Sequence, residues 1–184
     1  MEYLSIRTLR PNVSRQEALQ AFSAGGFTSL YSRLRSGPLQ RIADAYVPFC
    51  LYRVRYRLGS ALQTRLFALD AVDGSLDLFE FPRAPQADQL VHLETRNHLL
   101  PALSSAQAEA LLRDKVLRIV FQQGIFKLHR PEFEMTREAP DFYIPYWLGF
   151  YGNDGIARCR VMDAVRRRME GAKAASFFEQ WLAA

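Results

Sequence analysis

The feature that most constrains the fold of this chain is a short sequence pattern that occurs twice. Residues 44–49 (DAYVPF) and 141–146 (DFYIPY) share the pattern D-x-Y-[VI]-P-[FY]. Weaker matches keep the same order along the chain: 11–14 with 101–104, 26–30 with 124–128, and 69–72 with 162–165. Matches that keep one order predict an internal duplication, with two diverged copies of a single structural unit.

Each copy is predicted to begin with a short strand followed by a helix. The expected strands are 3–9 and 90–95, and the expected helices are 15–24 and 105–123. Ser14 and Ser104 stand just before the helices, where a hydroxyl can accept hydrogen bonds from the free amides of the first turn. Gly25, Gly26 and Gly124 suit the left-handed positions that end helices.

Period-two alternation marks the strands that follow each helix. The expected strands are 46–58, 64–72 and 76–81 in the first copy, and 143–151 and 156–165 in the second. In the first of them, tyrosines and aliphatic residues alternate with Arg53, Arg55 and Arg57, as in a strand with one buried face. Asp73-Gly74 predicts a tight hairpin turn.

These elements predict an α+β fold of two units packed together, each with a helix on its own antiparallel sheet. The proline-containing stretch 82–85 separates a unit at 1–85 from a unit at 86–184. The helix at 105–123 is apolar over more than half its circumference, which predicts a central helix that is covered on several sides.

An extra helix near the end of the chain carries an apolar stripe of Ala174, Phe177, Phe178 and Trp181. A segment this short is not a stable helix alone, so the stripe must dock. We expect it to dock on the protein's own sheet, because an exposed stripe would be a large apolar patch.

Composition bounds the class of protein. The chain has 184 residues, a net charge of +5 and 23% charged residues, which is ordinary globular usage. It lacks a signal-peptide pattern and an apolar run long enough for a membrane helix, so we expect a cytoplasmic protein. Cys50 and Cys159 do not make a disulfide framework, and the histidines lack metal-ligand spacing. We expect no metal and no cofactor.

The repeated acids and tyrosines are the first candidate ligand-binding residues. They are Asp44, Tyr46, Asp70, Asp141, Tyr143 and Asp163. In a functional interpretation, Asp70 and Asp163 face each other as a carboxylate pair for acid–base work. In the structural interpretation, which we favour, the acids cap turns and the prolines lie at strand starts, edges or bulges.

Arginines form the second candidate set. Arg53, Arg55 and Arg57 share one strand face, and a denser cluster consists of Arg158, Arg160, Arg166, Arg167 and Arg168. Both could bind phosphate or nucleic acid, but alternation sends the tyrosines of the strand to the opposite face from its arginines. We therefore favour solvated surfaces for both sets.

The sequence contains no phosphate loop, nucleophile elbow or metal motif. Our best interpretation is a non-catalytic binding or adaptor protein whose partner is another protein or a second copy of itself. Two alternatives stay open. One is a binder of nucleic acid or a phosphate ligand that uses the arginine clusters, and the other is an enzyme with its site between the two units.

Overall fold

The computed structural model describes residues 2–24, 37–58, 61–122, 133–152 and 158–183. This part of the chain forms an eight-stranded, mostly antiparallel sheet and three α-helices. The strands are β1 (Leu4–Leu9), β2 (Leu39–Leu58), β3 (Ala61–Asp70), β4 (Phe79–Phe81), β5 (Leu90–Thr95), β6 (Phe133–Tyr151), β7 (Arg158–Asp163) and β8 (Arg168–Met169). The helices are α1 (Arg15–Ser23), α3 (Ser105–Gln122) and α4 (Ala172–Ala183), and a 3-10 turn spans Ala87–Gln89.

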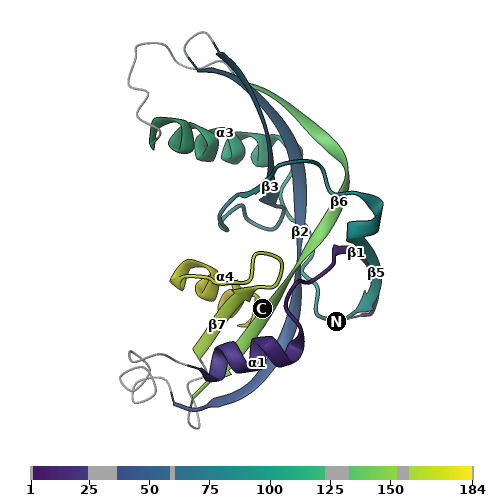
Figure 1. Ribbon diagram of the computed structural model, residues 1–184, viewed down its shortest axis with the longest axis vertical. Helices are drawn as coiled ribbons and strands as arrows, with labels where there is room; N and C mark the ends of the chain where they lie inside the picture. The colour runs from purple at the N-terminus through teal and green to yellow at the C-terminus, as the bar shows by residue number, and fades with distance from the viewer. Residues whose placement is uncertain (1, 25–36, 59–60, 123–132, 153–157, 184) are drawn as a thin grey trace.

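Two long strands, β2 and β6, run antiparallel through the length of the molecule. β3 and β4 extend the sheet beside β2, while β7 and β8 extend it beside β6. β1 and β5 pair with each other, and β1 joins β6 in parallel. Figure 1 shows that the three helices lie on the concave side of this bent sheet. One sheet therefore includes strands of both expected units, and the prediction of a separate sheet in each unit is wrong.

The repeated pattern lies where β2 and β6 cross the middle of the molecule. Val47 faces Ile144, with the pairs Tyr46–Pro145 and Pro48–Tyr143 on either side. The prolines are thus inside central strands rather than at the strand starts or edges that we expected, although an irregularity in the pairing, between Phe49 and Leu51, directly follows Pro48. The Pro48 and Pro145 carbonyls accept from the amides of Ala71 (2.8 Å) and Ala164 (3.1 Å), just past the ends of β3 and β7, and these contacts show why the prolines are tolerated. The missing proline N–H falls where the neighbouring strand stops.

Two helices begin with the same side-chain cap. The Ser14 hydroxyl accepts from the Glu17 amide at 3.3 Å, and the Glu17 carboxylate accepts from the Ser14 amide at 2.8 Å. Ser104 and Gln107 repeat this arrangement at 3.3 and 2.9 Å. These capping boxes confirm the predicted starts of α1 and α3. The glycines expected at their ends lie outside the described residues.

The long helix α3 is not the centre of the fold. Only one of its faces is fully buried, against one end of the sheet, through Ala108, Leu112, Val116 and Val120. Phe121 remains 45% exposed. The prediction of a helix covered on several sides is wrong because apolar residues also occupy positions at the margin of the packed face.

The tight hairpin expected at Asp73-Gly74 is a wider loop, since β3 ends at Asp70 and β4 begins at Phe79. Gly74 has a positive φ of 68°, and a β-carbon there would come within 2.7 Å of the Leu111 side chain. Glycine is needed at this position for both reasons. The loop thereby packs closely on α3.

The last helix docks on the protein's own sheet, as the stripe predicts. Phe177 and Phe178 are buried, and the Phe178 ring lies 5.4 Å from the ring of Tyr146 on β6. Trp181 is only partly buried, with its ring 6.3 Å from that of Phe178. The stripe therefore fixes α4 through its two phenylalanines and leaves the tryptophan at the surface.

Candidate functional site

Asp70 and Asp163 occupy matching places at the ends of β3 and β7, opposite Phe49 and Tyr146 respectively. Asp70 accepts from the amides of Asp73, Gly74 and Leu76, at 3.1, 2.8 and 2.9 Å. Asp163 accepts from the amides of Val165 and Arg166, at 2.8 and 2.7 Å, and from the Arg166 guanidinium at 2.5 Å. Each carboxylate closes a turn, and no hydrogen bond joins the two among the described residues.

The buried Asp70 predicts a specific dependence of stability on pH. Burial raises the pKa of Asp70, and the amides of Asp73 and Gly74 partly oppose this shift. A raised folded-state pKa means that the contribution of Asp70 to stability is complete below the unfolded-state pKa, about 3.9, and is lost as pH rises through the folded-state value. The unfolding free energy of the wild type minus that of Asp70→Asn should therefore fall as the pH rises above about 4, the unfolded-state pKa.

Urea unfolding of both proteins at several pH values measures this difference. Asp77→Asn is a suitable control, because the Asp77 side chain is 68% exposed. A difference that stays level or increases with pH would contradict the assignment.

Asp44 and Asp141 are both engaged by neighbouring polar side chains. Asp44 accepts from the Tyr46 hydroxyl at 3.1 Å and from the Asn97 side chain at 2.7 Å. Burial, and then the charge of Asp44, raise the pKa of Tyr46. The Asp141 carboxylate accepts from Arg137 at 2.5 Å, while its backbone carbonyl accepts from Arg7 at 3.0 Å. These partners account for both acids without a ligand.

The tyrosine of the second copy differs from that of the first. Tyr143 is half-buried, and burial followed by the charge of Asp141 raises its pKa. Its backbone carbonyl accepts from the Thr8 hydroxyl at 3.0 Å, where β1 meets β6. This contact places Tyr143 in the joint between strands.

The arginine face of β2 carries its own counter-charges. Arg53 and Arg55 pair with Glu138 at 2.7 Å and Glu134 at 3.5 Å on β6. Arg57 is exposed beside them. Tyr52 and Tyr56 point to the opposite, buried face. Bases stacked on aromatic rings need both on one surface, so this geometry favours the solvated interpretation.

The second arginine cluster is divided among several contacts. Arg166 bonds Asp163, Arg167 pairs with Glu17 at 2.7 Å, and Arg168 pairs with Glu170 at 2.9 Å. Arg160 lies over the ring of Tyr151 at 5.5 Å, and Arg158 is exposed on β7. Three of these five arginines are therefore ion-paired with acids. Arg166 lines a cavity that the sequence did not reveal.

Both cysteines are buried and free. Burial raises the pKa of the Cys50 thiol to about 11 and that of the Cys159 thiol to about 12. Thiols with such values are poor nucleophiles and metal ligands at neutral pH. In the part of the chain that the structure describes, His, Cys, Asp and Glu side chains form no group suited to a metal ion.

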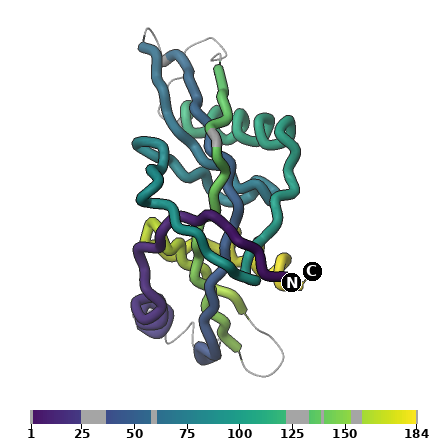
Figure 2. Tube along the Cα trace, turned by 90° about the vertical axis from the view of Figure 1, so that its right-hand side faces the viewer, coloured from purple at the N-terminus to yellow at the C-terminus, as the bar shows by residue number. Residues whose placement is uncertain are grey.

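An apolar groove of about 480 Å³ lies between the start of β1 and the end of α4. Its walls are Glu2, Tyr3, Leu4, His98, Leu100 and Trp181. Tyr3 and Leu100 are each 65% exposed, and Leu4 is 40% exposed. Figure 2 shows the two ends of the chain side by side at this place. Apart from Trp181, no sequence pattern marked these residues, because they come from three separate segments.

No family model, curated protein or solved structure matches this chain. None of the helices in the described ranges has the length and apolarity that crossing a membrane requires.

Proposed function

We propose that this chain is a non-catalytic protein-binding module, and that its docking surface is the apolar groove lined by Tyr3, Leu4, Leu100 and Trp181. The proposal is carried by the exposed side chains of Tyr3, Leu4 and Leu100, which surround one hollow together with the partly buried Trp181. Tryptophan and tyrosine are enriched among the residues that dominate binding energy at protein interfaces. A contiguous apolar patch on a folded surface commonly marks such a contact.

The partner that best fits the groove is a second copy of this chain. Glu2 lies at the rim, and Arg96 stacks over the Tyr3 ring at 4.2 Å, so both signs of charge occur beside the apolar walls. A two-fold symmetric contact brings the same patch of each copy together. Such a contact can pair Glu2 of one copy with Arg96 of the other while the apolar walls cover each other.

The contacts made by the other candidate site residues also favour binding over catalysis. Asp44, Asp70, Asp141 and Asp163 are engaged by backbone amides or neighbouring side chains. The arginine face of β2 pairs largely with glutamates of β6. Enzymatic and nucleic-acid functions therefore have less geometric support than the groove.

Sedimentation velocity over a range of concentrations tests this proposal. We expect the wild type to dimerise, and Leu100→Glu to weaken the dimer about tenfold or more, because it places a charge in the apolar contact. Leu62→Glu is a matched control, since Leu62 is 59% exposed on β3, outside the groove. A wild type that stays monomeric at millimolar concentration (roughly the weakest useful affinity), or equal effects of both variants, would overturn the proposal.

We also propose that the chain arose by internal duplication of the units 1–85 and 86–184. Support comes from the way β2 and β6 face each other around Val47 and Ile144, and from the matched capping boxes. The parallel contacts Thr8–Tyr143 and His98–Tyr46 also correspond, because each tyrosine belongs to the repeated pattern.

Free, buried cysteines support the proposal of a cytoplasmic location, since thiols stay reduced in the cytoplasm.

A further inference from the structure

One end of the sheet is formed by β5, which pairs with β1 and with no other described strand. Figure 1 shows β5 at the outer margin of the sheet, beyond β1. Its six residues include no proline, glycine or lysine, and its register with β1 contains no bulge. The opposite end of the sheet, β4, has only three residues and leads directly into Pro82. A free strand edge such as β5 is a template for pairing with another strand.

The direction of the free backbone groups of β5 follows from one hydrogen bond. The Arg10 amide donates to the Gln89 carbonyl at 2.9 Å. Opposite residues in an antiparallel pair alternate between pairs that are joined by hydrogen bonds and pairs that are not. Counting along the register from this bond, the next residue of β5 that bonds β1 is Val91. The residues between direct their N–H and C=O groups outward, where no described group bonds them; they are Leu90, His92 and Glu94.

A second copy of this edge matches the first. A two-fold axis beside His92 would run the two β5 strands antiparallel, with His92 opposite itself and Leu90 opposite Glu94 of the other copy. The outward backbone groups of both strands then face each other at every hydrogen-bonding position. A shift of one residue would set outward groups against inward ones, so only steps of two are possible.

The side chains of β5 also fit this register. Val91 and Leu93 are half-buried on one face, beside the buried Ile6 of β1. Each would lie opposite the other residue of the second copy, in the pairs without hydrogen bonds, where side chains are closest. On the other face, Glu94 lies opposite Leu90 and not opposite its own copy, so no two carboxylates oppose each other.

The two ends of β5 carry opposite charges. Asp88 precedes the strand and Arg96 follows it, and both are exposed. An antiparallel two-fold contact brings each end beside the opposite end, so Asp88 of either copy lies near Arg96 of the other. Arg96 also stands beside the groove, over the Tyr3 ring, but a guanidinium has five N–H donors and can serve acids on two sides. This charge complementarity favours a second copy over an unrelated strand.

From these features we infer that β5 is a second self-association surface, at which two copies pair edge to edge and join their sheets. The contact does not rest on the groove, because its axis passes beside His92, whereas Leu100 and Trp181 line the groove. Two six-residue strands make a small contact beside a standard interface, so it is weaker than the groove contact. Chains that make both contacts assemble into species larger than a dimer at high concentration.

Disulfide trapping of the full chain tests this inference in the Leu100→Glu background, which removes the groove contact. His92→Cys places a thiol on the axis, where opposite α-carbons are about 5.5 Å apart and a disulfide can span them. Glu94→Cys is the matched control, because it is exposed on the same strand face, yet its two copies would lie about 14 Å apart. The native Cys50 and Cys159 are buried.

We expect mild oxidation at about 1 mM protein to give at least about tenfold more covalent dimer from His92→Cys than from Glu94→Cys. Adding Glu94→Pro to His92→Cys removes one outward N–H, leaves the pairing with β1 intact, and should lower the yield. Equal yields from the two cysteines, no covalent dimer from His92→Cys, or an unchanged yield with Glu94→Pro would each overturn the inference. A failed groove contact would appear separately, as equal sedimentation of the wild type and Leu100→Glu.

Discussion

Replacing Phe178 by alanine should lower the free energy of unfolding by about 3–5 kcal/mol, the usual cost of truncating a buried aromatic side chain. Phe178 has no exposed surface, and its ring contacts those of Tyr146, Phe177 and Trp181. Its loss leaves a cavity under α4, where neighbouring side chains relax only in part. Equilibrium urea unfolding of the wild type and the variant, followed by circular dichroism, measures the change.

Trp181→Ala is the matched comparison on the same helix. Because Trp181 is only partly buried, we expect a loss of about 1–2 kcal/mol, together with weaker dimerisation through the groove. The sequence alone suggested that Trp181 would be as deeply buried as the phenylalanines of its stripe. Equal destabilisation by the two variants would mean that α4 is held along its whole stripe, and that Trp181 is a core residue.

Local sequence signals placed most elements of the fold well. β5 was predicted with the bounds it has, α1 and α3 to within a residue, and the buried and exposed faces of β2 by period-two alternation. These features depend on caps and on one strand's own pattern. Proline was the main source of error, because Pro48 and Pro145 appeared to mark strand starts. The beginnings of β2 and β6 were therefore missed. A proline is tolerated inside each of these strands because the neighbouring strand, β3 or β7, ends beside it, and the local sequence does not show where that neighbour ends.

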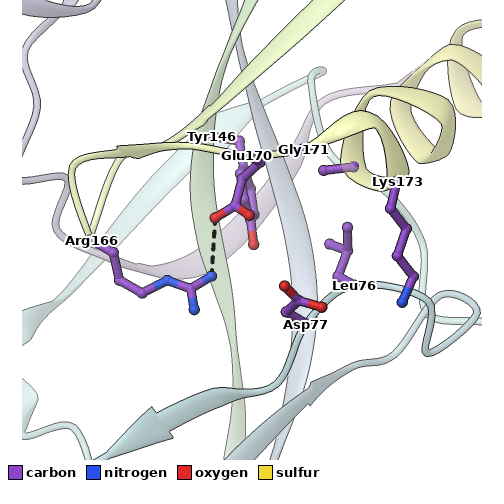
Figure 3. A pocket seen from close by; sticks show the side chains of 8 residues that line it. Leu76, Asp77, Tyr146, Arg166, Glu170, Gly171 and Lys173 are labelled. Carbon is purple, nitrogen blue, oxygen red and sulfur yellow. Dashed lines mark hydrogen bonds and ion pairs between the residues drawn. The ribbon is translucent and has the colours of Figure 1, made fainter.

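The candidate site followed less directly from the sequence. The sequence left a functional and a structural interpretation open for each repeated acid, and only the structure supplied the amides that Asp70 and Asp163 bind. The groove combines residues from the start, the middle and the end of the chain, and the small cavity beside Tyr146 (Figure 3) combines a loop, a strand and a helix start. Such sites are assembled by tertiary contacts, and no local period or spacing encodes them.

Asp163→Ala is expected to be about as damaging as the Phe178 substitution, with a loss of about 3–5 kcal/mol. Asp163 is fully buried, and its carboxylate holds the Val165 and Arg166 amides as well as the Arg166 guanidinium. Alanine leaves two amides and part of a guanidinium without their acceptor. Buried donors that lose their partners cost about 1–3 kcal/mol each.

Asp163→Asn distinguishes the stability that comes from the hydrogen bonds of the turn from the stability that comes from the ion pair with Arg166. Its side-chain carbonyl can still accept from the Val165 and Arg166 amides, but the amide group cannot balance the charge of Arg166. We therefore expect asparagine to recover part of the stability lost with alanine. Chemical unfolding of both variants measures the loss of stability. If alanine and asparagine are equally damaging, the ion pair rather than the turn is what Asp163 contributes. If neither variant loses stability, the turn that ends β7 is not held by its buried carboxylate.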